Sequence, residues 1–295
     1  MEERKHAFMI GCYQNPDYLE SFIDSLDGER SNFYIHINKK NIEDFRYFID
    51  KMSVRENVSI VEPISINWGG MGLLKATRLM LNKAIANPDN YYFHLLTGQD
   101  ALVRPLNELY SFFDQHKDSN FIPIVVGPLN ENDKVNILDW MQYYHTFDML
   151  NYRGSVINRA IEKGTVLLQK LFCRKRVLPE KNIYKGSGWF SLNRKAVSIL
   201  QEYLNNENNL KKWRYTYAPD ECLPHTLLYN SNENLNIVND NLRFIVWNKE
   251  KKQFPAVLDD SFFDDIIKSN KFFCRKIDPR KSSGLLKKLK VYYNK

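Results

Sequence analysis

The stretch HAFMIGCYQNPDYLESFIDSLDGERSNFYIHINK, residues 6–39, decides the fold class. Its two ends are apolar runs of strand length, and the segment between them carries apolar residues at helical spacing. A strand, a helix and a second strand in this order predict a βαβ unit with parallel strands.

The same alternation continues along the chain. Residues 41–52 predict a helix, 57–63 a strand, 72–86 a helix and 90–98 a strand that ends at a Gly-Gln-Asp turn. We therefore expect an α/β fold with a mostly parallel central sheet flanked by helices. Ligands of such sheets bind at the carboxyl ends of the strands, so a site is expected near INKK (37–40), INWGG (66–70) and LTGQD (96–100).

Composition indicates one compact unit. The 295 residues are 43% hydrophobic, and Gly and Pro are too few for long linkers. Four scattered cysteines without a CxxC pair indicate neither a zinc site nor a disulfide framework, which favours a reducing compartment. The first apolar run is too short for a signal peptide, and no run is long enough to span a bilayer, so a cytoplasmic protein is expected.

The net charge of +7 leaves two interpretations of the basic segments open. KLFCRKR, residues 170–176, raises the alternative of a nucleic-acid-binding protein, although no recognisable RNA or DNA module accompanies it. The basic amphipathic segment 279–295 suits an anionic membrane surface, or is a solvated end.

Two acidic patterns have both a structural and a chemical interpretation. In TYAPDE, residues 216–221, Pro219 and the acids behind it suit the first turn of a helix, so local sequence favours capping. Neighbouring acids on a helix point about 100° apart, so one of the pair Asp220 and Glu221 is free for chemistry. LDDSFFDD, residues 258–265, is most simply an acidic helix start, with a carboxylate metal cluster as the alternative.

Six segments occur in the order found in one enzyme family. They are INWGG (66–70), YYFHLLTGQDALVRPLNEL (91–109), GSGWFSLNR (186–194), TYAPDE (216–221), NLRFIVW (241–247) and FFCRKID (272–278). The chain thereby resembles the core-2/I-branching β-1,6-N-acetylglucosaminyltransferases, whose relatives include peptide O-xylosyltransferases. The resemblance implies a single GT-A-like catalytic domain, residues 1–278. Its nucleotide-sugar half is expected at 1–118 and its acceptor half at 119–278, with an insertion at about 130–185.

The resemblance also implies an inverting reaction and its main groups. Glu221 matches the general base that takes the proton of the acceptor hydroxyl, and Asp220 orients the loop or bonds a donor hydroxyl. The chain has no Asp-x-Asp, so no divalent metal or other cofactor is expected. Arg243 and Lys276 match the basic pair that stabilises the diphosphate instead, and Arg275 is placed to assist.

The resemblance further implies residues that hold the two sugars. The nucleoside and donor are expected at Gly11, Tyr13, His36, Asn38, Trp68 and Asp100. Asn38 stands where better-known members have aspartate, and Asp100 either bonds the donor or holds its loop. Trp189, beside small residues, is expected to stack on the acceptor, with a partly buried position as the alternative.

The implied function is transfer of N-acetylglucosamine from UDP-N-acetylglucosamine to a glycan hydroxyl. Xylose, galactose and glucose are the alternative donor sugars, and an inactive glycan-binding relative is a further alternative. Without the anchor, stem and disulfides of vertebrate members, the chain groups with bacterial, cytoplasmic relatives that build surface polysaccharide. We accordingly expect a lipid-linked acceptor, a peripheral position at the inner face of the cytoplasmic membrane, and no nucleic-acid partner.

Overall fold

A seven-stranded, mostly parallel sheet forms the centre of the molecule. The computed structural model describes residues 4–133, 136–247 and 255–293. The sheet has the order β10-β6-β9-β4-β1-β2-β3, and β1 pairs in parallel with both β2 and β4. Its first four strands are β1 (Lys5–Cys12), β2 (Ser31–Ile37), β3 (Val58–Ile60) and β4 (Asn90–Thr97). The expected βαβ units and the expected α/β fold class are confirmed.

One strand reverses direction within this sheet. β9 (Ser191–Asn193) runs antiparallel to β4 and to β6 (Ser119–Phe121), and β10 (Asn236–Val238) extends the sheet in parallel with β6. Ser191 lies opposite His94, near the carboxyl end of β4. The segment that enters β9 therefore lies at the same edge as the segments that leave the parallel strands.

Both faces of the sheet are covered, which explains the unbroken apolar run of β1. Phe8 and Ile10 belong to one hydrophobic core, whereas Ala7 and Met9 belong to the other. Helices α1 (Pro16–Leu26) and α4 (Leu106–Gln115) contribute to the first core, together with α2 (Arg46–Met52), which follows a 3-10 turn at Lys39–Phe45. Helices α3 (Gly72–Ile85), α7 (Arg194–Asn205), α8 (Glu207–Trp213) and α9 (Leu223–Tyr229) contribute to the second. In a sheet covered on both faces, successive side chains are both buried.

A small second sheet contains three short strands from the C-terminal part of the chain and from the segment after β4. β11 (Arg243–Ile245) pairs in parallel with β12 (Phe273–Arg275), which pairs antiparallel with β5 (Ala101–Leu102). The turn Asp260–Phe262 and helix α10 (Phe263–Lys268) lie between β11 and β12 in sequence. This sheet joins the C-terminal part of the chain to the segment that follows β4.

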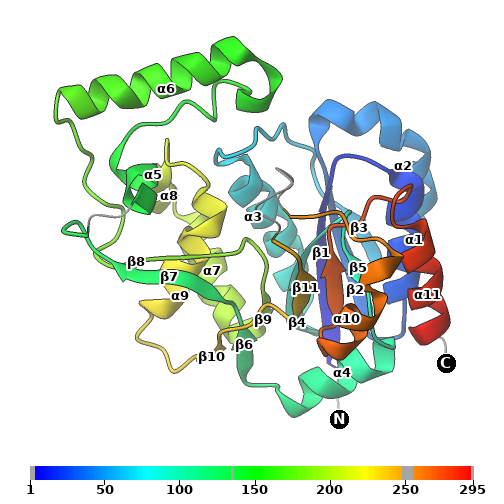
Figure 1. Cartoon of the computed structure of the whole chain (residues 1–295). Coiled ribbons are helices and arrows are strands. Elements are labelled where there is room, and N and C mark those ends of the chain that lie inside the picture. Colours follow the sequence, from blue (N-terminus) through cyan, green and yellow to red (C-terminus); the bar gives the residue numbers. More distant parts are fainter. Residues whose placement is uncertain (1–3, 134–135, 248–254, 294–295) are drawn as a thin grey trace.

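The insertion extends from a two-stranded hairpin. β7 (Ile124–Leu129) and β8 (Ile183–Gly186) pair antiparallel, with Leu129 opposite Ile183. Between them lie the turns Asn136–Leu138 and Tyr152–Gly154 and the helices α5 (Asp139–Gln142) and α6 (Val156–Leu171). Helix α6 stands apart from the sheets (Figure 1), and Glu162 is its buried residue.

The C-terminal segment is part of the first core. Helix α11 (Ser283–Tyr293) packs beside the turn Asp260–Phe262, and its Leu285 and Leu289 are buried. The expectation that the leucines of 279–295 are available to a membrane surface is therefore wrong for these two, because they already have apolar partners in the protein. Within the described residues, no helix has the length and apolar content needed to cross a membrane.

Candidate active site

Loops from several strands meet at the carboxyl edge of the parallel strands. The amide of Asn38, after β2, donates to the carbonyl of Cys12 at 2.9 Å, and the amide of Gly98, after β4, donates to the carbonyl of Gly11 at 3.0 Å. A Cβ built on Gly11 would meet no described atom within 4 Å, so the chain there borders open space. The structure thus brings together the ends of β1, β2 and β4, where a ligand was expected.

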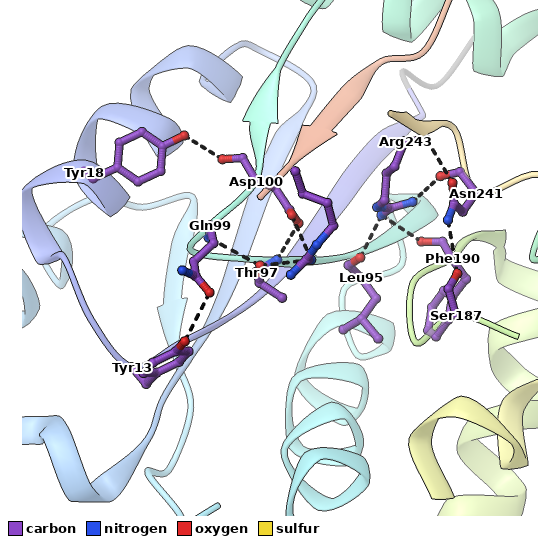
Figure 2. A network of polar contacts seen from close by, with 11 residues as sticks. Tyr13, Tyr18, Leu95, Thr97, Gln99, Asp100, Ser187, Phe190, Asn241 and Arg243 are labelled. Carbon is purple, nitrogen blue, oxygen red and sulfur yellow. Dashed lines mark hydrogen bonds and ion pairs between the residues drawn. The ribbon is translucent and has the colours of Figure 1, made fainter. Parts of the chain in front are cut away.

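Asp100 holds the loop after β4 and one of the predicted cations. Its side chain is fully buried, with Oδ1 2.9 Å from Nη1 of Arg275 and Oδ2 accepting the Thr97 amide at 2.8 Å. The Tyr18 hydroxyl donates to the Asp100 carbonyl at 2.7 Å, and that of Tyr13 donates to Gln99 at 3.2 Å (Figure 2). Of the two roles open for Asp100, these contacts favour holding the loop rather than bonding the donor.

Trp189 stacks on a cation of the protein itself. The Cζ atom of Arg275 lies 3.8 Å from the centroid of the Trp189 ring, and Trp189 is partly buried. One face of the ring is therefore already covered, and the prediction that Trp189 stacks on the acceptor has less support than its alternative. Burial lowers the pKa of Arg275, and the charge of Asp100 opposes that shift.

Arg243 is engaged inside the protein and is not presented to solvent. Its Nη2 donates to the carbonyls of Leu95 at 2.7 Å and Phe190 at 3.4 Å, and its Nη1 donates to that of Asn241 (Figure 2). Burial lowers the pKa of Arg243 to about 10, so the guanidinium stays charged at neutral pH. In this arrangement Arg243 ties β11 to β4 and β9, and its two terminal nitrogens are occupied by carbonyl oxygens.

Lys276 is the predicted cation that remains available. Its side chain is half-buried and has no hydrogen bond or ion pair to another described residue. Burial, followed by the charges of Arg275 and Arg153, lowers the pKa of Lys276, while Asp278 opposes the shift. Three cations share this neighbourhood, so an added anion would be stabilised there by charges already in place.

The acidic pair lies on a 3-10 turn and does not cap a helix. Pro219–Glu221 forms that turn, and α9 begins two residues later with no side-chain cap within the described structure. The Ala218 amide donates to the Gly69 carbonyl at 2.8 Å, which fastens the turn to the INWGG loop. Pro219 and both acids thus occupy a first turn, as the local sequence indicates, but that of a short 3-10 turn, and α9 begins after them at Leu223.

Asp220 and Glu221 have different surroundings. Oε2 of Glu221 is 2.8 Å from Nζ of Lys185, and the Glu221 side chain is about one-third exposed at 36%. Asp220 points toward Gly188, where a Cβ would lie 3.3 Å from its Oδ2. Burial, and then the charge of Glu221, raises the pKa of Asp220 to about 7. One acid is thus paired with a cation at the surface, and the other is desolvated beside the Gly-Ser-Gly segment.

The remaining nucleoside candidates divide into open and buried positions. Tyr13 is exposed, whereas His36 is buried, its Nε2 accepts the Ile64 amide at 3.2 Å, and burial lowers its pKa to about 4. His36 is therefore buried behind the open edge, and its contact with a nucleoside stays a prediction. Asn38 caps the turn that follows it, since its Oδ1 accepts the amides of Lys40 and Ile66, each at 3.2 Å.

Trp68 lies with the acceptor-side insertion rather than with the nucleoside loops. Its ring contacts Tyr217 edge-on, with centroids 5.4 Å apart, and Cζ of Arg153 lies 4.1 Å from its centroid. It borders a cavity of about 380 Å³ between the INWGG loop and α6. The cavity is lined by Trp68, His145, Phe147, Tyr152, Glu162, Lys163, Val166, Leu167, Lys170 and Tyr217. Aromatic rings with interspersed polar groups are typical of sugar-binding surfaces.

Two site residues were missed from the sequence. Lys185 precedes the GSGWFSLNR segment by one position, and Tyr217 lies inside TYAPDE, but neither stands out by type or spacing. Their roles follow from the turn at Pro219–Glu221, which places Glu221 against β8 and the Tyr217 ring against Gly69.

The acidic segment 258–265 and the basic segment 170–176 form ordinary structural contacts. Asp259 accepts the Ser261 amide at 3.0 Å, and Asp260 pairs with Lys288 at 3.3 Å, as expected of an acidic helix start. No cluster of three potential metal ligands occurs among His, Cys, Asp and Glu in the described residues. In the basic segment 170–176, Lys170 pairs with Asp139 at 2.5 Å and Arg176 donates to the Lys212 carbonyl at 3.0 Å.

Comparisons with known proteins identify one enzyme family. The Core-2/I-branching enzyme family matches residues 6–267. Xylosyltransferase 2 of Rattus norvegicus is 25% identical over 252 residues, and that of Homo sapiens is 25% identical over 250 residues. Each alignment covers 82% of this chain and 26% of the relative, so the chain spans about a quarter of the length of these relatives. Among solved structures, 4-diphosphocytidyl-2C-methyl-D-erythritol synthase from Anaerococcus prevotii aligns with a TM-score of 0.36 at 13% identity, over 91% of this chain and 95% of that one.

Proposed function

The chain belongs to the Core-2/I-branching enzyme family of glycosyltransferases, and from this premise we propose that it is an inverting enzyme that uses a UDP-sugar to glycosylate a hydroxyl of a glycan. The observation that carries the proposal is the Glu221 carboxylate, held 2.8 Å from Lys185 at the edge where the strand-end loops meet. A positioned carboxylate at a partly open site is what an acceptor hydroxyl requires.

Glu221 is the proposed general base. As the acceptor oxygen forms its bond to the anomeric carbon, the bond from that carbon to the diphosphate breaks on the opposite face. The hydroxyl proton passes to Glu221, and UDP leaves with the bonding electron pair. Lys185 fixes the carboxylate, and Asp220, desolvated beside it, is placed to bond a donor hydroxyl.

The diphosphate is assigned to Lys276, with Arg275 beside it. Lys276 offers an ammonium without a partner among the described residues, and Arg275 is held rigidly between Asp100 and Trp189. Arg243 holds β11 beside them through its hydrogen bonds to backbone carbonyls. Preorganised cations such as Lys276 and Arg275 stabilise the negative charge that develops on a leaving group. The proposal therefore requires no divalent metal.

Two donor sugars are supported by different observations. N-acetylglucosamine follows from the resemblance of the six segments to the branching transferases. Xylose is favoured by the curated relatives, which are named xylosyltransferases. A panel of UDP-N-acetylglucosamine, UDP-xylose, UDP-galactose and UDP-glucose, read out as UDP release, decides between them. The proposed acceptor is a lipid-linked glycan of a surface polysaccharide at the cytoplasmic face of the membrane.

The test of the base is the substitution Glu221→Gln, which keeps the shape of the side chain and removes its basicity. We expect UDP release with the preferred donor to fall about 10²–10⁴-fold, because general-base catalysis contributes that much. Glu233→Gln is the matched control, since Glu233 forms an exposed ion pair with Lys195 at 2.9 Å. Equal rates for Glu221→Gln and wild type would remove Glu221 from the mechanism.

The assignment of the diphosphate to Lys276 is tested with a chelator and with two lysine substitutions. Turnover is expected to persist in EDTA and to fall about 10²-fold in Lys276→Met, because one preorganised charge at a leaving group has an effect of that order. Lys281→Met, at an exposed position nearby in sequence, is expected to leave turnover unchanged. A strict requirement for manganese, or full activity of Lys276→Met, contradicts the assignment.

A further inference from the structure

Exposed apolar side chains are concentrated on the insertion. Of the seventeen large apolar side chains that are exposed in the described part of the chain, ten lie between residues 144 and 177. Scattered exposed apolar residues are normal, whereas a contiguous group marks an interaction surface. The group lies on and around α6, which stands away from the sheets (Figure 1).

Four apolar residues of α6 and its C-terminal cap form a stripe that points away from the protein. At about 100° per residue, Ile157, Ile161, Leu168 and Phe172 share one face of the helix. Ile157, Leu168 and Phe172 are 70%, 56% and 73% exposed. The opposite face carries Glu162 and Val166, which border the cavity beside Trp68.

Helix α6 is fixed to the protein through its polar face. Glu162 is buried, with Oε1 2.6 Å from Nδ1 of His145 and Oε2 accepting the Thr146 amide at 2.7 Å. Burial alone would raise the pKa of Glu162, but the hydrogen bonds of His145 and Thr146 outweigh it and lower the pKa. These contacts orient the helix, so the apolar stripe is held outward as a fixed surface.

The charges around the stripe indicate which kind of surface it would bind. Between residues 149 and 177 the one acidic side chain is Glu162, and it is buried. Arg174 and Lys175 are exposed beside the stripe at the C-terminal end of α6, and Arg159 and Lys163 are exposed on the side of the helix away from the stripe. An amphipathic helix with a basic polar face and an exposed apolar stripe lies in the interface of an anionic membrane, with the apolar face buried about 5–10 Å deep.

We propose that α6 is the membrane-docking element of this protein and that its partner is an anionic lipid surface. The apolar stripe enters the interface, and the neighbouring cations contact lipid headgroups. Because the opposite face of α6 borders the cavity beside Trp68, docking brings that cavity to within about one helix diameter, roughly 10 Å, of the lipid. The link to a lipid-linked acceptor rests on the proposed function, but docking itself does not.

The experiment is flotation of the full chain with vesicles of phosphatidylcholine, either alone or with phosphatidylglycerol. The wild type is expected to float with the anionic vesicles at low salt and to be released by high salt. The stripe variant Ile157→Gln/Leu168→Gln/Phe172→Gln is expected to bind at least about tenfold more weakly, because it removes the inserted apolar area. Tyr47→Gln/Val54→Gln/Val125→Gln, three exposed apolar residues on other elements, is the matched control and is expected to bind like wild type.

The contribution of the cations to vesicle binding is measured with two double variants. Arg174→Gln/Lys175→Gln is expected to weaken binding about fivefold for each cation removed, whereas Lys287→Gln/Lys290→Gln on α11 is expected to have no effect. Flotation of the stripe variant like wild type, or loss of flotation only in the α11 pair, overturns the proposal. A dimer of the wild type that the stripe variant converts to a monomer, with no flotation of either, would assign the stripe to a second copy of the chain. UDP release on a soluble acceptor is measured in parallel, so that failure of docking and failure of catalysis are seen separately.

Discussion

At the scale of single residues, neighbouring acids are distinguished by what surrounds them. Asp220 and Glu221 are adjacent in sequence, yet Glu221 has a cation at 2.8 Å and Asp220 is desolvated. Burial and the neighbouring carboxylate therefore raise the pKa of Asp220 to about 7.

The raised pKa of Asp220 predicts how stability depends on pH. In the unfolded chain this pKa is near 3.8, and in the folded protein it is about 7. The folded state therefore binds the proton more tightly, so the stabilisation is fully present below about pH 4 and is lost as pH rises through 7. Asp220→Asn does not titrate, so relative to wild type it is expected to gain up to about 4 kcal/mol of unfolding free energy between pH 4 and pH 8.

Urea unfolding of wild type and Asp220→Asn at pH 4, 6 and 8 measures this difference. Asp118→Asn serves as the control, because Asp118 is exposed. A difference between Asp220→Asn and wild type that stays constant from pH 4 to pH 8 would show that Asp220 is solvated in the folded protein.

The chemical type of the site residues could be predicted from the sequence, but their hydrogen-bond and ion-pair partners could not. The matched segments pointed to Glu221, Arg275 and Lys276, which lie on the 3-10 turn Pro219–Glu221, at the end of β12 and directly after β12. The burial of Arg243 and His36 could not be predicted, because it depends on carbonyl oxygens and amides supplied by distant strands. Lys185 was missed for the same reason, since its only distinction is a spatial neighbour.

At the scale of elements, the β7–β8 hairpin packs against the helix that follows the Pro219–Glu221 turn. Gly186 ends β8, and a Cβ there would lie 2.0 Å from the Pro123 carbonyl oxygen and 2.3 Å from Nε2 of His225. His225 belongs to α9, which follows the Pro219–Glu221 turn. The approach of hairpin and helix therefore requires glycine at this position.

Two glycine substitutions test that requirement. Gly186→Ala is expected to destabilise the protein by about 3 kcal/mol or more, because backbone and helix must move apart. Gly164→Ala is the control in the opposite direction, since no described atom lies within 4 Å of its Cβ and alanine favours helix by about 1 kcal/mol. Thermal unfolding of both variants checks the prediction, and an unchanged melting temperature for Gly186→Ala contradicts it.

Most elements were predictable because their apolar periodicity is strong. The helix expected at 41–52 begins instead as a 3-10 turn, Lys39–Phe45, with Asn38 as its cap. The apolar run 121–128 is divided between β6 and β7, with Pro123 between them, because proline lacks the amide needed to continue the ladder. The direction of β9 could not be predicted, since its three residues carry no signal for antiparallel pairing.

At the scale of the whole molecule, the first core reaches the C-terminal helix. Leu285 and Leu289 of α11 lie in the same core as Phe22 and Phe33. The basic composition of this segment obscured its packing, because the lysines occupy the exposed positions between the leucines. An amphipathic pattern alone does not distinguish a helix that packs on its own protein from one that packs on lipid.

Because Leu285 and Leu289 of α11 are buried, shortening either side chain is expected to lower the free energy of unfolding markedly. Leu289→Ala is expected to reduce the unfolding free energy by about 2–5 kcal/mol, as for other fully buried leucines. Val291→Ala, on the exposed face of the same helix, is expected to change it by less than about 0.5 kcal/mol. Urea unfolding compares the two, and equal stabilities would show that α11 is detached in solution.

The pairing of Leu129 with Ile183 has a consequence for how this enzyme could diversify. The insertion departs from the fold and returns to it at two opposed residues of one hairpin, so its ends stay fixed whatever lies between them. Doubling the length of a flexible connection adds only about 0.6 kcal/mol of closure entropy. Changes of length between these two residues therefore leave the register of the hairpin and of the central sheet unchanged, provided that Leu138 and Met141, which are buried in the second core, are kept.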